Sequence, residues 1–193
     1  HPDHCQPAWP DVLRIIANSD SALVKLAPAA NIELADLPES HRCWISLGGT
    51  VREQTLLCGS AMKSSGLPSG GKSAAALASD GAATWFVPGM NDLESHCGDV
   101  CARPLDFLID PDAAIRAAGL TETYACQHAL AILGSPSGYL TCDTATPFHA
   151  ASSSMAVVGE VIWTGSCDDR KLRKELRSRG VYPSVIKVRG TNH

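Results

Sequence analysis

The chain opens with short apolar runs separated by polar and Pro-rich breaks, a pattern typical of a helix followed by strands. Residues 11–20 (DVLRIIANSD) gather their apolar side chains on one side, which predicts a short helix capped by Asp11. Residues 22–28 (ALVKLAP) predict a compact strand stopped by proline. Two β-rich arms then flank Gly48-Gly49 in CWISLGGTVREQTLLCG, the signature of a tight two-residue hairpin. This order is how an α/β sheet finishes, so we expect a missing N-terminal partner before His1.

The middle of the chain predicts a loop, a second hairpin and an irregular stretch. Residues 60–72 are rich in Ser and Gly and predict the loop. Residues 73–89 (SAAALASDGAATWFVPG) predict a hairpin that turns at Asp80-Gly81. From there to Arg103 the pattern is irregular.

After Arg103 the patterns predict a small α+β unit, and the chain shows no internal repeat. Strands are expected at LDFLIDP (105–111), GYLTCD (138–143), SMAVVGEVIW (154–163) and SVIKVRG (184–190). Helices are expected at PDAAIRAAGL (111–120), TYACQHALAIL (123–133) and DDRKLRKELRSRG (168–180). The last helix has the strongest signals, because Asp168 or Asp169 caps it, basic residues fill its last turn and Gly180 closes it.

Charge is distributed unevenly along the chain. The 193 residues are 45% hydrophobic, which is enough to bury a core, and carry a net charge of −4. Residues 168–193 hold eight basic and three acidic side chains, a local charge of +5, so the remainder carries −9. Any contact with a polyanion is therefore expected at the C-terminal end.

Neither a membrane segment nor a secreted disulfide framework is indicated. No apolar run reaches the roughly 18 residues of a membrane span, and no signal-peptide pattern opens the chain. The eight cysteines are not dense enough to require disulfides, and several sit in apolar runs. These features favour reduced thiols in a cytoplasmic protein.

The stretch GLPSGGKS, residues 66–73, matches the P-loop pattern G-x-x-x-x-G-K-[ST]. The preceding apolar run ends at Gly59, too early for a P-loop, and fewer than two turns of helix fit before Asp80. We interpret the stretch as a mobile connector with Lys72 facing solvent. A P-loop NTPase stays open as the less favoured alternative.

Two groups of metal-ligating residue types occur in the chain. The first group is His96, Cys97 and Cys101, and the second is His1, His4 and Cys5. No second Cys/His pair at zinc-finger spacing completes a site, so no metal is predicted. His128 is interpreted as a packing residue of an apolar helix, and His149 has nothing nearby to orient it. No catalytic residue is identified.

The basic helix near the C-terminus is the candidate binding surface. Leu172 and Leu176 are four residues apart and are expected to face inward, which leaves the basic side chains for solvent. A solvated amphipathic face explains this pattern, and a phosphate-contacting surface is the alternative. The candidate RNA phosphate contacts are Arg170, Lys171, Lys174, Arg177, Lys187 and Arg189. The lack of interleaved aromatic residues argues against base stacking.

The order of these pieces resembles one protein family. The matching segments are VKLAP, WISLGG with VREQTLLCG, FLIDPDAAIRAAGL, GYLTCD, and KLRKELRSRGV with VIKVRG, and they cover roughly residues 9–190. Together they resemble the C-terminal half of bacterial class I methyltransferases that carry a THUMP-like domain. Members of that family use S-adenosylmethionine on a Rossmann-like sheet.

The resemblance implies an α/β (α+β) fold in three stretches. Residues 1–59 would be the distal part of the Rossmann-like methyltransferase sheet, and residues 60–103 a connecting loop and hairpin region. Residues 104–193 would form a ferredoxin-like, THUMP-like α+β domain. By analogy, the parent protein would methylate RNA.

The chain also departs from the family pattern. It contains no G-x-G-x-x-G turn for the cofactor, and its His1-Pro2-Asp3-His4 start does not match the catalytic-loop motif. We therefore carry over no catalytic or cofactor residue and expect this chain alone neither to bind S-adenosylmethionine nor to turn over. An exposed sheet edge would allow a homo-oligomer. A non-enzymatic RNA-binding or protein-interaction module is the other alternative.

Overall fold

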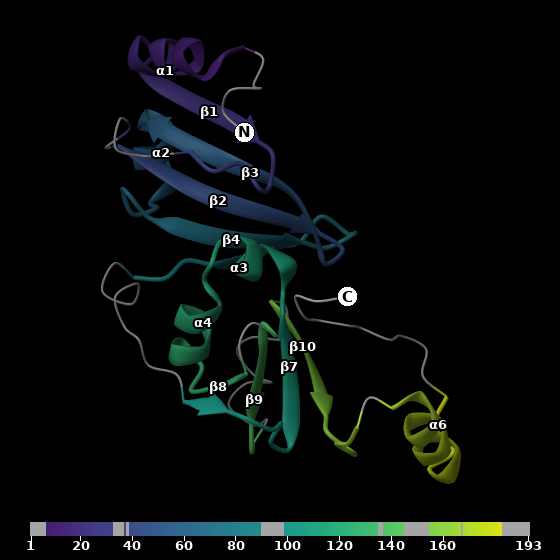
Figure 1. The fold of residues 1–193 in the computed structure, drawn as a ribbon. Coiled ribbons are helices and arrows are strands. Elements are labelled where there is room, and N and C mark those ends of the chain that lie inside the picture. The colour runs from purple at the N-terminus through teal and green to yellow at the C-terminus, as the bar shows by residue number, and fades with distance from the viewer. Residues whose placement is uncertain are drawn as a thin grey trace.

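The computed structural model describes residues 7–32, 37, 39–89, 99–134, 137–144, 155–166 and 168–182, and the statements below concern these residues. They form two five-stranded mixed sheets with short helices between and beside them (Figure 1). No helix in these ranges is long and apolar enough to cross a membrane.

The first sheet, sheet A, has the order β1-β3-β2-β4-β5. Its strands are β1 (Ser21–Leu26), β2 (Ser40–Leu47), β3 (Thr50–Gly59), β4 (Lys72–Leu77) and β5 (Ala83–Phe86). Only the β2–β4 pair is parallel, and the other neighbours are antiparallel. It follows that β1, β2 and β4 all run in the same direction.

The second sheet, sheet B, has the order β10-β7-β9-β8-β6, with a parallel β6–β8 pair. Its strands are β6 (Val100–Cys101), β7 (Phe107–Pro111), β8 (Ala131–Leu133), β9 (Tyr139–Cys142) and β10 (Ala156–Glu160). The helices are α1 (Trp9–Ala17), α2 (Ser60–Ser65), α3 (Ala113–Ala117), α4 (Thr121–Gln127) and α6 (Asp169–Ser178).

Both predicted hairpins are confirmed. Gly48 and Gly49 link β2 to β3 with φ of 58° and 74°, values that a two-residue turn requires and glycine adopts without strain. The β4–β5 turn places Gly81 at φ 87°, and the Asp80 carboxylate accepts a hydrogen bond from the Ala82 amide. Local turn chemistry therefore sets the register of both strand pairs.

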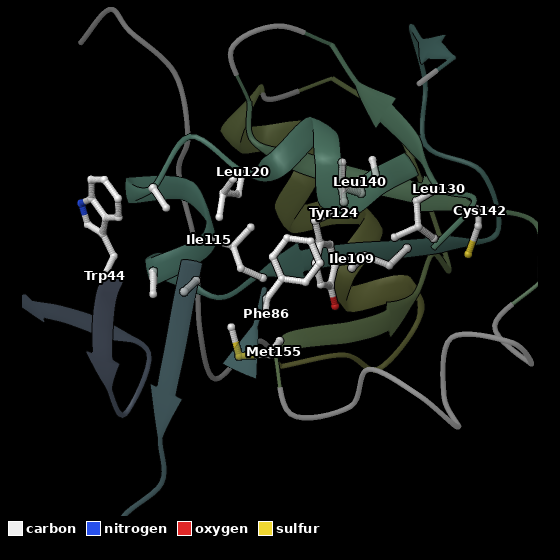
Figure 2. Packing of buried hydrophobic residues seen from close by; sticks show 14 residues of the cluster. Trp44, Phe86, Ile109, Ile115, Leu120, Tyr124, Leu130, Leu140, Cys142 and Met155 are labelled. Carbon is white, nitrogen blue, oxygen red and sulfur yellow. The ribbon is translucent and has the colours of Figure 1, made fainter. Parts of the chain in front are cut away.

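The main hydrophobic core joins the two sheets through α3 and α4 (Figure 2). Ile115 of α3 and Tyr124 of α4 are almost fully buried among side chains of both sheets. Sheet A contributes Trp44 and Phe86, and sheet B contributes residues such as Leu140. A second cluster lies under α1, where Ile16, Leu26, Leu37, Leu56 and Cys58 pack together.

Several predicted elements need correction in the first half of the chain. The predicted loop at residues 60–72 begins with helix α2, and the predicted irregular stretch contains the short strand β6. Asp11 does not cap α1, since Ala8 is the N-cap and Asp11 instead accepts a hydrogen bond from the Arg14 guanidinium. A Pro at the start of α1 takes over the role of the cap, because proline has no orphan amide to satisfy.

The predicted helix at residues 123–133 is correct only in its first half. Helix α4 ends at Gln127, Ala129 adopts φ 52°, and the chain continues as β8 against β9. Strand pairing with β9 outweighs the helix preference of this apolar stretch. The predicted strand at residues 184–190 lies outside the described residues.

Two further helix predictions are confirmed in part. Within the predicted 111–120 helix, α3 covers only Ala113–Ala117, because Pro111 belongs to β7, and the N-cap Asp112 accepts a hydrogen bond from the Ala114 amide. Asp168 caps α6 by accepting from the Lys171 amide at 2.8 Å. However, α6 buries no residue, and Leu172 and Leu176 are only half-buried.

The cysteines are only partly reduced. Cys43, Cys58, Cys101 and Cys142 are free thiols, as predicted, but Cys126 is disulfide-bonded. The prediction of reduced thiols is therefore wrong for Cys126.

Candidate functional site

The P-loop-like stretch is a turn tied to strand β2. The Gly70 amide donates to the Ser40 carbonyl at 2.8 Å, and one nitrogen of His41 lies 2.8 Å from the Pro68 carbonyl. Lys72 and Ser73 begin strand β4 instead of a helix, so no helix N-terminus follows the turn. The P-loop alternative is therefore wrong, and the predicted connector is fixed by hydrogen bonds, with Lys72 half-buried.

His41 and Ser73 form a pair with the geometry of a general base and a nucleophile. His41 Nε2 lies 2.8 Å from Ser73 Oγ, while Nδ1 is oriented by the Pro68 carbonyl. Both residues have 0% exposure, so no substrate reaches the hydroxyl. Burial lowers the pKa of His41, partly opposed by its hydrogen bond to Pro68. The pair therefore acts as a structural tie between β2, β4 and the turn.

A second polar group lies in sheet A on the neighbouring side chains of β2 and β3. Arg42 donates from Nε to Gln54 Oε1 at 3.0 Å, and its guanidinium lies 4.7 Å from the centre of the Trp44 ring. Arg42 Nη2 and Gln54 Nε2 both donate to the Ala30 carbonyl at 3.2 Å. The Trp44 indole donates to the Pro28 carbonyl at 3.0 Å. These three side chains together hold the segment that follows β1.

Sequence reasoning missed this group. The signal was present in HRCWISL, because two basic residues interrupt a strand whose other residues are typical of a buried position. What the sequence does not reveal is that Arg42 and Trp44 bind carbonyls of a loop more than ten residues upstream.

Among the cavities lined by described residues are two that open at the surface. One of about 490 Å³ lies beside β8 and β9 and includes His128, Cys142 and the exposed Asp99 and Asp143. The His128 ring lies 4.4 Å from that of Tyr124, and burial lowers its pKa, which confirms its predicted packing role. The other cavity, about 560 Å³, lies between α1 and the end of β3.

No metal centre forms within the residues whose placement is described. These ranges contain no group of three or more His, Cys, Asp or Glu side chains that could hold a metal ion. Cys101 is a half-buried free thiol in β6, and the other two residues of its sequence group, His96 and Cys97, lie outside the described ranges. The cluster of His1, His4 and Cys5 lies outside them too, as does His149.

The basic helix α6 stands to one side of both sheets (Figure 1). Its ion pairs are Arg173–Asp169 at 3.0 Å and Arg179–Glu175 at 2.7 Å. Four further basic residues are exposed and form no ion pair in the described part of the chain: Arg170, Lys171, Lys174 and Arg177. The structure thus brings four of the six predicted contacts together on one helix, and Lys187 and Arg189 lie outside the described residues.

Gly59 is a glycine at a strand-to-helix junction, between β3 and α2. A cofactor site of the Rossmann type needs a glycine-rich turn between a strand and a helix, with open space over the glycines. A Cβ placed at Gly59 would collide with the Asp20 carbonyl oxygen. The Asp20 backbone already fills that space.

Comparison with known proteins places the fold. No protein-family model and no curated protein matches the sequence. Among solved structures, the chain is similar to a putative methyltransferase from Porphyromonas gingivalis W83, with 18% identity and a TM-score of 0.61. The match covers 91% of this chain and 44% of that one, so this chain spans less than half of the neighbour's length. The predicted mixed α/β (α+β) class is confirmed by the two mixed sheets, and the fold is similar to that of the matched part of this neighbour.

Proposed function

We propose that this chain is the distal part of an S-adenosylmethionine-dependent methyltransferase that acts on RNA. The observation that carries the proposal is the fold match over 91% of the chain to 44% of a putative methyltransferase. In this proposal the cofactor is bound by a part of the longer protein outside this chain. The chain alone is then inactive, in keeping with the filled space at Gly59.

Strand β1 supports the proposal as the place where the rest of a catalytic sheet would attach. Its described pairing is with β3 alone, so its other edge presents backbone donors and acceptors. Leu23 in this strand is 68% exposed, which is unusual for the middle of a finished sheet. Further methyltransferase strands would cover this edge. Alternatively, a second copy of the chain could pair with this edge of β1. Measuring the oligomeric state in solution distinguishes these two possibilities.

The C-terminal part supplies the RNA contact in this proposal. We assign residues 104–193 to a THUMP-like, ferredoxin-like domain and the four unpaired cations of α6 to RNA phosphates. These cations are exposed and already in one helix, so binding needs no ordering of the backbone. A cytoplasmic location belongs to the proposal; the four free cysteines agree with it, whereas the Cys126 disulfide does not.

The RNA part is tested by fluorescence anisotropy with a single-stranded RNA over a series of salt concentrations. The double variant Lys174→Gln/Arg177→Gln removes two unpaired cations, and Arg173→Gln/Arg179→Gln is the control with the same charge change at paired positions. The slope of log K against log salt should weaken by about 1.4 in the first variant, at about 0.7 per contact. The control should change the slope much less. Equal losses would mean that RNA senses only net charge.

The methyltransferase part is tested separately by calorimetry. We expect no S-adenosylmethionine binding to this chain and methyl transfer to RNA by the longer protein. Micromolar binding of the cofactor to the chain alone would contradict the assignment of the cofactor site elsewhere. RNA binding without methyl transfer by the longer protein would favour a non-enzymatic RNA-binding module, which the basic helix by itself also supports.

A further inference from the structure

The four unpaired cations of α6 lie on one side of the helix. Helix residues that are three, four or seven positions apart share a side, because a turn contains 3.6 residues. Arg170, Lys174 and Arg177 follow this spacing, and Lys171 lies three positions before Lys174. The two half-buried leucines of α6 lie on the opposite side. The four cations therefore form a continuous row, which we call the cation stripe, about 10 Å long at about 1.5 Å per residue.

The acidic residues of α6 are engaged away from this stripe. Asp169 pairs with Arg173 at 3.0 Å, and Glu175 pairs with Arg179 at 2.7 Å. Both arginines lie outside the stripe, and within the described residues no ion pair involves a stripe cation. An exposed row of one sign of charge attracts a polyanion, and nucleic-acid phosphates are such a partner.

Tyr182 lies directly beyond the end of α6. The helix ends at Gly180, which has φ 64°, and the Gly180 amide donates to the Arg177 carbonyl at 3.2 Å. The Val181 amide donates to the Leu176 carbonyl at 2.9 Å, which completes a Schellman ending. Val181 is half-buried, whereas Tyr182 is 88% exposed. These backbone bonds fix the chain as far as Val181, so Tyr182 follows one residue after the hydrogen-bonded end.

The exposure of this ring is unusual. Tyr182 has the highest exposed fraction among the large hydrophobic side chains of the described residues, and Val100 follows at 69%. An aromatic ring is a large apolar surface that a folded chain normally covers at least in part. The ring of Tyr182 therefore contributes little to packing and is accessible to a partner.

Cations beside an exposed aromatic ring are the combination that binds single-stranded nucleic acid. The cations contact phosphates along the backbone, and a base stacks on the face of the ring. No aromatic residue lies within α6, as the sequence indicated, but Tyr182 supplies a ring immediately after it. The sequence argument against base stacking therefore applies to the helix itself and not to the surface that includes Tyr182.

We propose that Tyr182 stacks on an unpaired base of the RNA whose phosphates lie along the cation stripe, so that this surface prefers single-stranded to double-stranded RNA. This inference rests on the proposed RNA-directed function. Bases within a duplex are already stacked on their neighbours, so a duplex obtains the phosphate contacts alone. Stacking uses the ring face, so the Tyr182 hydroxyl is not required.

Fluorescence anisotropy of the full 193-residue chain tests the proposal with three probes of equal length. The probes are an oligouridylate, a double-stranded RNA and an abasic ribose-phosphate strand. The native chain should bind the oligouridylate most tightly. Tyr182→Ala should weaken that binding about fivefold or more and leave binding of the abasic strand unchanged. Tyr182→Phe keeps a stacking ring and should bind as the native chain does.

Trp85→Ala is the matched control, because it removes a ring that is 52% exposed on β5, outside α6. It should leave the binding of all three probes unchanged. Since Tyr182 is almost fully exposed, Tyr182→Ala should also keep the urea midpoint of the native chain, which excludes unfolding as the cause of weaker binding.

Salt dependence separates this inference from the proposed function. Tyr182→Ala removes no cation, so its slope of log K against log salt should equal that of the native chain, whereas Lys174→Gln/Arg177→Gln weakens the slope. Unchanged oligouridylate affinity in Tyr182→Ala, or an equal loss for the abasic strand, overturns the stacking role and leaves RNA binding by α6 in place. If the native chain binds none of the three probes, the RNA part of the proposed function fails and this inference fails with it.

Discussion

Helices α3 and α6 differ in how strongly the sequence predicts them and in how much they contribute to the hydrophobic core. Helix α3 has five residues, yet Ala114 and Ile115 within it are fully buried in the core cluster that joins both sheets, where Figure 2 shows Ile115. Helix α6 has ten residues, an Asp cap and two internal ion pairs, yet it buries no side chain. The strength of a local helix signal therefore says little about what the helix contributes to the fold.

The difference has a physical basis. A helix stabilises a domain mainly through the apolar surface that it removes from water, and only a little through caps and exposed ion pairs. Helix α3 removes apolar surface from water, whereas α6 has only a cap and exposed ion pairs. Because the side chains of α6 are not buried in the core, they remain accessible to a partner, and the proposed RNA contact lies there.

The largest expected effect comes from Ile115→Ala in α3. Removing a fully buried side chain between the two sheets should lower the free energy of unfolding by about 2–5 kcal/mol. Urea denaturation followed by tryptophan fluorescence measures the change. A loss below about 1 kcal/mol would mean that α3 does not join the two sheets into one core.

Acid should weaken the body of the protein through its buried histidines. Burial lowers the folded-state pKa of His41 and of His128 below the ordinary value of about 6.5. The unfolded chain then binds more protons than the folded chain below that pH, so stability is full above about pH 6.5 and falls as the pH drops through the folded-state values. Urea midpoints at several pH values measure this loss.

His41→Gln provides the matched variant for this pH dependence. Glutamine can still donate to the Pro68 carbonyl but does not titrate, so the fall in stability towards acid should be shallower than in the native chain. Control measurements on His128→Gln separate the second histidine. An unchanged slope in both variants would contradict the assignment of the acid sensitivity to these rings.

A smaller and more local effect is expected from Asp168→Ala. The carboxylate accepts a hydrogen bond from the Lys171 amide, and loss of such a cap costs about 1 kcal/mol of helix stability. Because α6 buries nothing, amide exchange within α6 should rise while the urea midpoint of the whole protein stays the same. A clear drop in that midpoint would show that α6 packs on the body more firmly than its exposure indicates.

The smallest effect on stability is expected from Lys174→Gln. This exposed cation forms no ion pair in the described part of the chain, so its loss should change the free energy of unfolding by less than about 0.5 kcal/mol. The same variant should weaken RNA binding at low salt. A stability loss larger than that of Asp168→Ala would reverse the contrast between the two helices.

Much of the local structure could be predicted because its causes are local. The glycine pair between β2 and β3 needs positive φ at both positions, and Asp168 satisfies an amide three residues away. The candidate cations of α6 were also predicted, because a helix pattern with four-residue apolar spacing places the remaining side chains in solvent. Sequence reasoning missed the group of Arg42, Trp44 and Gln54, in which Arg42 binds the Ala30 carbonyl across twelve positions of chain.

The sequence by itself determined the two hairpins, the Asp168 cap and the exposed basic helix, since each depends on residues close to one another in the chain. Only the tertiary structure decided that Ser73 ties to His41 instead of serving a nucleotide, and that residues 131–133 form strand β8 instead of continuing α4. In both cases a partner distant in sequence offered hydrogen bonds that local preference does not supply. Long-range pairing outweighs propensities of a few tenths of a kcal/mol per residue, and only the folded chain reveals which partner is present.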